Sequence, residues 1–163
     1  MRVEVKRPSE CSPTELQTFL SVVIETGEVQ TEGLAGLVER AECLILLYTD
    51  LNELAGVVAV KHPNESYRRN VFRKANSPEN PDRYPYEIGW VVVREGFRGL
   101  RLSHVLLESA LEFVGKTKIY VTTQTDNEPM LRTNKRCGLH ASGEPYASDR
   151  RGGAYKLSLF IKE

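Results

Sequence analysis

The residues best suited to chemistry form a glycine-bearing turn between an apolar strand and a helix. The strand is expected over residues 86–94, the turn over 95–101, and the helix from 101 to about 114. Amides in the first turn of a helix lack carbonyl partners within the helix, and the helix dipole adds partial positive charge there. Arg98 and Arg101 would reinforce that charge, so phosphate or pyrophosphate is the expected ligand. Strand–turn–helix units are common, and a plain connection with two solvated arginines explains the spacing equally well.

The cysteines and histidines indicate neither a metal site nor a nucleophile. Cys11, Cys43 and Cys137 have no regular spacing, no Cys-x-x-Cys pair occurs, and the three histidines stand at no metal-ligand spacing. Cys137 lies beside Gly138, but no histidine is placed to activate it. A small core residue is therefore the better interpretation of Cys137.

Composition excludes two classes of protein. The 163 residues are 40% hydrophobic and 27% charged, and the formal net charge is zero. A protein that is basic throughout, and a long acidic tail, are both excluded. The balance is uneven, however: residues 1–60 hold four basic against ten acidic residues, and residues 61–163 hold eighteen against twelve. This asymmetry predicts an anionic partner for the second part of the chain.

The apolar runs are short. The start of the chain, 1–8, has no apolar signal core, and the runs 43–48 and 54–60 fall far below the roughly 20 residues that span a bilayer. Together with the sparse, irregular cysteines, these features predict a soluble, reduced, cytoplasmic domain that does not enter a membrane.

The first part of the chain predicts a strand, two helices and a hairpin. Val3 and Val5 alternate with polar residues as in a short strand. Ser12-Pro13-Thr14-Glu15 has the residues of a capping box, and the helix after it should end at Gly27. A weaker helix should begin near Thr31 and bury three residues, Leu34, Leu37 and Val38. Runs 43–49 and 54–61 read as an antiparallel hairpin.

The remaining segments surround the turn. Residues 62–85 are polar, contain four prolines and show no sustained periodicity, so we expect a long functional loop. A strand over 118–123 follows the central helix. A short helix capped by Asp126 or Asn127 should end before Gly138, and two strands, 139–146 and 155–161, should flank a turn at 149–153. One α/β domain over 1–163 is the simplest organisation.

The segment from Tyr86 to Ser103 resembles the acyl-CoA-binding segment of the GNAT superfamily of N-acetyltransferases. The family turn reads Arg/Gln-x-x-Gly-x-Gly/Ala after an apolar strand, and here it reads Arg-Gly-Leu-Arg-Leu-Ser over 98–103. Arg98 matches, Arg101 stands where the family has glycine, and Ser103 replaces glycine or alanine. The flanking Gly-Phe-Arg-Gly and Val-Leu-Leu-Glu-Ser-Ala-Leu runs also resemble the family.

A second resemblance lies downstream. Residues 127–139 are similar to the next family motif, with Asn127 at the helix start and Gly138-Leu139 in place of its Gly-Phe. The family often has a tyrosine four residues before this glycine, where this chain has Asn134. The order of elements also agrees over nearly the whole chain. The resemblance implies a three-layer α/β (α+β) fold whose mixed, mostly antiparallel sheet has central parallel strands, 86–94 and 118–123, that splay apart.

The resemblance also implies a site and a co-substrate. Acetyl-CoA would lie between the splayed strands, with backbone amides near 92–94 polarising its thioester carbonyl as in an oxyanion hole. Amides of the turn would hold its pyrophosphate. The cofactor-binding residues expected on these grounds are Val92, Val93, Arg94, Arg98, Gly99, Leu100, Arg101, Leu102, Ser103 and Asn127. An arginine at 101 would either obstruct close phosphate approach or add a cation.

Two residues are expected to act in catalysis. Glu87 lies eleven residues before Arg98, where some family members carry a base glutamate, although a carboxylate at the start of a strand commonly just faces solvent. Asn134 cannot supply a titratable proton, but its amide could donate a hydrogen bond to the leaving thiolate. Three tyrosines, Tyr120, Tyr146 and Tyr155, are alternatives for the general acid. A thiol with a pKa near 8.5 needs little acid assistance near neutral pH.

The resemblance implies direct acetyl transfer to a primary amine on a small molecule or peptide. The acceptor would be selected by segment 62–85, which mixes five basic residues with aromatic ones. Such a mixture can bind nucleic acid, but five basic residues are few for that purpose. Two alternatives stay open: a GNAT-fold protein without acetyl transfer, which binds CoA or modifies nucleic acid, and a small interaction module. The sequence leaves the oligomeric state open, a homodimer included.

Overall fold

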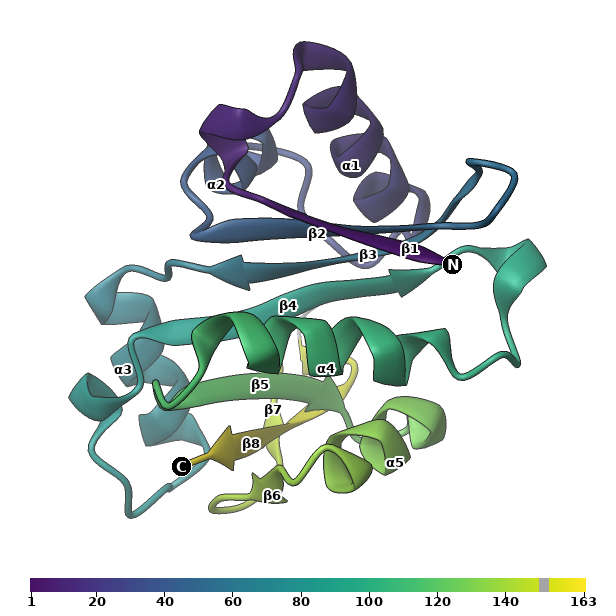
Figure 1. Ribbon diagram of the computed structural model, residues 1–163. Helices are drawn as coiled ribbons and strands as arrows, with labels where there is room; N and C mark the ends of the chain where they lie inside the picture. Colours follow the sequence, from purple (N-terminus) through teal and green to yellow (C-terminus); the bar gives the residue numbers. More distant parts are fainter. Residues whose placement is uncertain (150–152) are drawn as a thin grey trace. The chain divides into compact units, whose positions relative to one another are not determined.

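The computed structural model describes residues 1–149 and 153–163 and has a mixed α/β fold with a mostly antiparallel sheet (Figure 1). The chain forms two compact units. The first comprises Met1–His62 with Ile88–Val114, and the second comprises Pro63–Glu87 with Gly115–Glu163. Among the described residues, no helix has both the length and the apolar character that crossing a membrane requires.

The first unit is built on an antiparallel meander. Strands β1 (Arg2–Lys6), β2 (Cys43–Tyr48) and β3 (Leu54–Lys61) pair in chain order, which confirms the expected first strand and hairpin. Nearly every residue of β2 and β3 is buried, because helices cover both faces. Val57 belongs to the core beneath α1 (Pro13–Glu25), whereas Gly56 faces Leu106 of α4 (Leu102–Val114). Successive strand residues point to opposite faces, so β3 is packed between the two helices.

The start of α1 is the one that the sequence predicts. Ser12 accepts a hydrogen bond from the Glu15 amide at 3.1 Å, and the Glu15 carboxylate accepts one from the Ser12 amide at 2.9 Å. The short helix η1 (Pro8–Glu10) precedes it. Helix α2 (Leu34–Glu39) begins three residues later than expected, because Gly33 before it has a φ of 74°. Leu34 and Val38 are buried as expected, but the prediction for Leu37 was wrong, since Leu37 is 45% exposed.

Segment 62–85 is not the loop that the sequence predicts. It forms helix α3 (Glu65–Lys74) and the short helix η2 (Pro81–Arg83). Asn64 caps α3 by accepting a hydrogen bond from the Tyr67 amide at 2.8 Å. Only Val71 and Phe72 of this helix are buried, so its apolar stripe is too narrow to give a helical period in the sequence. The Phe72 ring packs 5.3 Å from that of Tyr84 and 5.3 Å from that of Tyr120, centroid to centroid.

The second unit contains the strands at the end of the chain. Strand β5 (Ile119–Gln124) pairs antiparallel with β8 (Lys156–Lys162), and β8 also pairs with β6 (His140–Ala141) and β7 (Tyr146–Ala147). The single strand predicted over 139–146 is therefore two short ones. A Cβ on Gly143 would lie 2.0 Å from the Ala75 carbonyl oxygen, and the Glu144 amide donates to that oxygen at 2.7 Å. This contact with the end of α3 interrupts the strand.

Strand β4 (Tyr86–Val93) belongs to both units. Its first two residues pair in parallel with β5, Tyr86 with Ile119 and Glu87 with Tyr120, as the family resemblance implies for these strands. Its later residues neighbour β3 and lead through η3 (Glu95–Phe97) to α4. Helix α5 (Glu128–Arg136) is capped by Asn127 and is followed by Gly138 at a φ of 83°, as expected. Residues 150–152 of the turn expected at 149–153 lie outside the described residues.

Candidate active site

The turn between β4 and α4 has the backbone geometry of an anion site. Gly99 has a φ of 85° and Arg101 a φ of 59°, so the chain twice adopts the left-handed conformation just before α4. The Arg101 carbonyl accepts a hydrogen bond from the His104 amide at 3.2 Å, which makes Arg101 the last residue before the helix. The amides of Leu102 and Ser103 therefore belong to the first helical turn, whose amides have no carbonyl partner within the helix. Leu100, like Arg98, is exposed on this turn.

The conformation of Arg101 explains why the family pattern has glycine at this position. A left-handed backbone costs a residue other than glycine about 1–2 kcal/mol. Arginine adopts it here at that cost, with its side chain exposed to solvent. Arginine in place of glycine therefore lowers the stability of the turn, but the backbone keeps the conformation that glycine would adopt.

The backbone groups of residues 92–94 point alternately toward the two edges of β4. The Val92 carbonyl oxygen faces Gly56, and the Arg94 amide donates to the Ala55 carbonyl at 2.9 Å. Backbone groups alternate in direction along a strand, so the Val93 amide points away from β3. The Arg94 amide, expected near the thioester, is hydrogen-bonded to β3 in this structure. Of these residues, Val93 has an amide directed away from β3.

The side chains of Arg94 and Arg98 stabilise this end of β4. Arg94 Nη1 donates to the Leu54 carbonyl at 3.4 Å, and its Nη2 lies 3.9 Å from a Glu25 carboxylate oxygen. Arg98 Nε donates to the Val93 carbonyl at 3.4 Å, so this arginine folds back over the strand. Both arginines are fixed to the protein backbone and still present charged guanidinium groups to solvent.

Trp90 is a feature of β4 that the sequence does not reveal. It has a φ of 52° in the middle of the strand, a strained conformation for an aromatic residue. Its indole packs edge-to-face on Phe19 with centroids 6.2 Å apart, and the Lys61 ammonium lies 4.6 Å from its ring centroid. Nothing in the amino-acid pattern marks this residue.

Glu87 lies in the second unit and is buried, with only 4% of the residue exposed. The alternative that it simply faces solvent is therefore wrong. Tyr120, opposite Glu87 in the parallel ladder, is fully buried, and burial followed by the Glu87 charge raises the pKa of its hydroxyl. Burial and then the charges of Glu87 and Asp149 also raise the pKa of Tyr146. Glu87 is thus a buried carboxylate with two neutral phenols near it.

Asn134 and Asn127 both support α5. Asn134 is completely buried, and its Nδ2 donates to Thr123 Oγ1 on β5 at 3.0 Å. Its Oδ1 is buried without a hydrogen-bond partner in the described part of the chain. Asn127 Oδ1 accepts from the Met130 amide at 3.2 Å and caps the helix. Asn134 therefore holds α5 to β5, a structural role that the sequence did not indicate.

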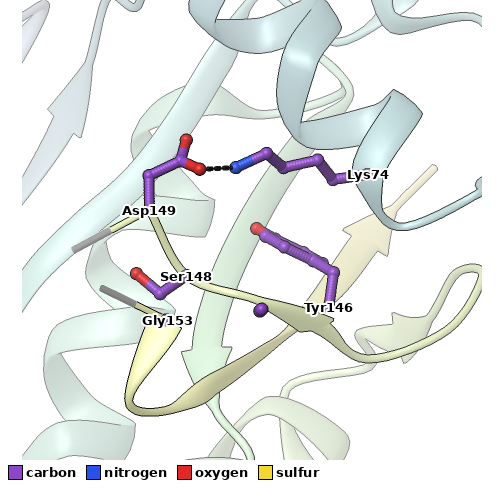
Figure 2. Close-up of a pocket in the computed structure, with 6 residues that line it drawn as sticks. Lys74, Tyr146, Ser148, Asp149 and Gly153 are labelled. Carbon is purple, nitrogen blue, oxygen red and sulfur yellow. Dashed lines mark ion pairs between the residues drawn. The ribbon is translucent and has the colours of Figure 1, made fainter. Parts of the chain in front are cut away.

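A shallow pocket of about 530 Å³ opens in the second unit (Figure 2). Its lining comes from the end of α3 and from β7 and the residues after it: Lys74, Tyr146, Ala147, Ser148, Asp149 and Gly153. The Lys74 ammonium forms an ion pair with the Asp149 carboxylate, as Figure 2 shows. Tyr146 lines this pocket, and burial followed by the Glu87 charge raises the pKa of its hydroxyl.

Three of the five basic residues of segment 63–85 form ion pairs within the second unit. Arg69 Nη2 lies 2.5 Å from Glu65 and 3.1 Å from Asp82, and it holds the pKa of Asp82 below its usual range. Arg68 lies 3.5 Å from the same Asp82, and Lys74 is paired with Asp149. These local ion pairs reduce the positive charge that the segment can offer to the phosphates of a nucleic acid.

Comparisons with known proteins identify the family. The model of the acetyltransferase (GNAT) family matches residues 14–139. Among solved structures, an acyl-CoA N-acyltransferase from Pseudomonas aeruginosa is 18% identical over 99% of both chains, with a TM-score of 0.72. ElaA from Escherichia coli is also 18% identical over 99% of both chains, with a TM-score of 0.71. NAA60 from Arabidopsis thaliana, in complex with acetyl-CoA, is 14% identical over 99% of both chains, with a TM-score of 0.69.

The comparison with curated proteins finds no match. The structural matches agree with the expected fold, and the family model covers more than three quarters of the chain, from α1 through α5. On this evidence the chain is a member of the GNAT family of acetyltransferases.

Proposed function

We propose that this protein transfers an acetyl group from acetyl-CoA to a primary amine by direct attack. The observation that carries the proposal is the turn before α4, where Gly99 and Arg101 take left-handed conformations and α4 begins at Leu102. Backbone amides presented in this way fit a pyrophosphate. Family membership supports the choice of co-substrate, and a structural neighbour from Arabidopsis thaliana is bound to acetyl-CoA.

In the proposed site the backbone of residues 93–103 binds the co-substrate. The amides at the start of α4 would hold the pyrophosphate, with Arg98 and Arg101 adding positive charge. The Val93 amide would donate to the thioester carbonyl oxygen and stabilise the negative charge that develops there. Because backbone atoms do this work, the replacement of glycine by Arg101 is compatible with binding.

Glu87 is the proposed general base. Its carboxylate would accept the proton that the amine loses as the nitrogen attacks the thioester carbon and the carbon–sulfur bond breaks. The leaving thiolate departs as such or takes up a proton from water, because a thiol with a pKa near 8.5 needs little acid assistance near neutral pH. Asn134 cannot supply that proton, and its Nδ2 is already donated to Thr123. The Glu87 charge raises the pKa of both Tyr120 and Tyr146. These tyrosines are therefore better placed to exchange protons with Glu87 than with the leaving thiolate.

A first experiment tests co-substrate binding, and a second tests turnover. Acetyl-CoA should raise the melting temperature and shift the NMR signals of amides 93 and 98–103. Release of free CoA thiol with a panel of primary amines should then report transfer. No shift at millimolar acetyl-CoA would refute the proposal.

Binding without turnover would instead favour a CoA-binding protein that lacks transferase activity. The replacement of the family tyrosine by Asn134, which is committed to Thr123, is the observation that supports this second candidate. Salt-dependent binding to tRNA or DNA would favour a nucleic-acid function, which the local pairing of Arg68, Arg69 and Lys74 disfavours.

A further inference from the structure

Trp90 has a backbone conformation that a regular strand does not require. Its φ of 52° lies in the left-handed region although it stands inside β4, and it is the one tryptophan of the chain. Ile88, two residues earlier, is fully buried, whereas Trp90 is half-buried. Strained backbone at a bulky residue recurs at ligand sites, where the surrounding structure maintains it. The strain therefore makes Trp90 a candidate for contact with a ligand.

The indole of Trp90 is held at one edge and carries a cation on its face. Phe19, which is fully buried, packs against it at an interplanar angle of 74° with centroids 6.2 Å apart. The Lys61 ammonium lies over the ring, 4.6 Å from the centroid. Tryptophan is the aromatic side chain that attracts cations most strongly. The ring is thus a fixed platform whose face accepts an ammonium group.

The group on this platform has the chemistry of the acceptor in the proposed reaction. A lysine side chain is an unbranched alkyl chain that ends in a primary ammonium. Free primary alkylamines have the same end group near neutral pH, because a lysine-type amine has a pKa of about 10.4. A partly exposed cation–π contact is weak. A second ammonium can therefore take the place of Lys61, because the exchange replaces one contact by another of the same kind.

Trp90 also lies close to the group proposed to hold the acetyl thioester. Trp90 and Val93 are three residues apart on the same strand, which corresponds to roughly 10 Å at the usual rise of a strand. Both belong to the first unit, as does the turn before α4. An amine bound on the Trp90 ring is therefore near the Val93 amide, and no contact with the second unit is needed to place it there.

The charge of the first unit favours a cationic acceptor. This unit includes eight basic and thirteen acidic residues. Three of the acidic residues, Glu25, Glu28 and Glu32, are exposed at the end of α1 and in the segment after it. Glu25 lies 3.9 Å from Arg94, so this acidic segment reaches the end of β4. Because an excess of one charge attracts ligands of the opposite charge, the unit favours an alkylammonium over an anionic acceptor.

We propose that the acceptor is an unbranched primary alkylamine that binds as an ammonium ion on the face of Trp90, where Lys61 takes its place when no acceptor is bound. This inference rests on the proposed function, because it names the acceptor of that reaction. Trp90 would select the acceptor and take no part in making or breaking bonds, so it is a specificity-determining residue and not a catalytic one. Only the deprotonated amine attacks the thioester, so the acceptor gives up its proton and leaves the ring before transfer.

The fluorescence of Trp90 tests binding directly, because no other tryptophan contributes to it. n-Butylammonium chloride is titrated into the protein at constant ionic strength, beside n-butanol, a neutral molecule of the same length. The salt should change the emission saturably, and the alcohol should not. In Lys61→Met the affinity for n-butylammonium should rise about three- to tenfold, because the competing ammonium is gone. Arg40→Met removes the same charge from an exposed site of this unit and should change the affinity by less than about twofold.

Lys61→Arg keeps a cation on the ring and should leave the affinity unchanged. Equal emission changes with the salt and the alcohol, or weaker binding in Lys61→Met, would overturn the inference. Release of CoA thiol from acetyl-CoA with n-butylamine separates this failure from that of the proposed function. Transfer without a change of Trp90 emission at saturating amine would refute the inference alone. Saturable binding without transfer to any amine would refute the proposed function and leave an alkylammonium site at Trp90.

Substitutions of Trp90 separate recognition from a structural role. Trp90→Phe keeps a ring but attracts cations less strongly, so KM for n-butylamine should rise about threefold while kcat and the melting temperature stay near those of the wild type. Trp90→Leu should raise KM at least about tenfold. Calorimetry measures amine affinity in both variants, which contain no tryptophan. A lower kcat with an unchanged KM in Trp90→Phe would show that Trp90 acts through the backbone of β4 and would contradict the inference.

Discussion

The turn before α4 and the cluster around Glu87 are built on opposite principles. The turn depends on backbone conformation, with Gly99 and Arg101 in left-handed geometry and side chains that face solvent. The cluster depends on side chains, since Glu87, Tyr120 and Tyr146 are all buried and electrostatically coupled. A site made of backbone atoms tolerates changes of residue type, whereas a buried polar site does not. This difference explains how the family pattern can be degenerate at Arg101 in a chain that keeps the fold.

The largest effect is expected at the cluster, from Glu87→Gln. Loss of the proposed base should lower kcat by about 100-fold or more, because general-base catalysis contributes 10²–10⁴-fold. Acetyl-CoA affinity, measured by calorimetry, should stay within about threefold. Glu112→Gln on the exposed face of α4 is the matched control and should be neutral. An unchanged pH–rate profile in Glu87→Gln would remove this residue from the mechanism.

Two glycine substitutions compare the regions by stability. Gly143→Ala should destabilise the protein by at least about 3 kcal/mol, because its Cβ would lie 2.0 Å from the Ala75 oxygen at a φ of 74°. Gly99→Ala has a similar φ of 85° with no atom within 4 Å, so it should cost about 1 kcal/mol. Urea denaturation measures both. Equal losses would show that close packing at Gly143 contributes nothing beyond backbone strain.

Alkaline pH should lower the stability of the protein through the buried tyrosines of the second unit, and should leave the turn before α4 unaffected. Burial raises the pKa of Tyr84 to about 12 and also raises those of Tyr120 and Tyr146 above the ordinary value near 10. A pKa raised by folding means that stability is fully present below pH 10 and is lost as pH rises through the folded-state values. Denaturation midpoints should therefore fall steadily above pH 10, and tyrosinate absorbance should rise with unfolding. Constant midpoints up to pH 12 would contradict this assignment.

The smallest effect is expected at the turn, from Arg101→Gly. Removal of the left-handed strain should stabilise the protein by up to about 1 kcal/mol, offset in part by the greater freedom of glycine in the unfolded chain. Acetyl-CoA affinity should change by less than about threefold, because backbone amides provide the proposed contacts. Arg98→Ala is a useful companion, since Arg98 holds the Val93 carbonyl. A large loss of affinity in Arg101→Gly would mean that the guanidinium, not the backbone, binds the anion.

Local rules predicted much of the fold and the backbone part of the site. The Ser12 capping box, the β2–β3 hairpin and the start of α4 each follow from residues close together in the chain, and each is confirmed. Helix α3 was missed because two buried residues, Val71 and Phe72, are too few to give a helical period. The break between β6 and β7 was missed because it depends on the contact of Gly143 with Ala75, distant in sequence.

The sequence by itself determined the strand–turn–helix segment and the family resemblance, because both rest on residue types at short spacing. The tertiary structure decided what the polar side chains do. It buried Glu87, set the Tyr120 and Tyr146 hydroxyls near its charge, and committed Asn134 to Thr123. It also placed Trp90 in a left-handed conformation with its ring packed edge-to-face on Phe19. Burial and electrostatic coupling join residues that lie far apart in the chain, and local pattern carries no information about such distances.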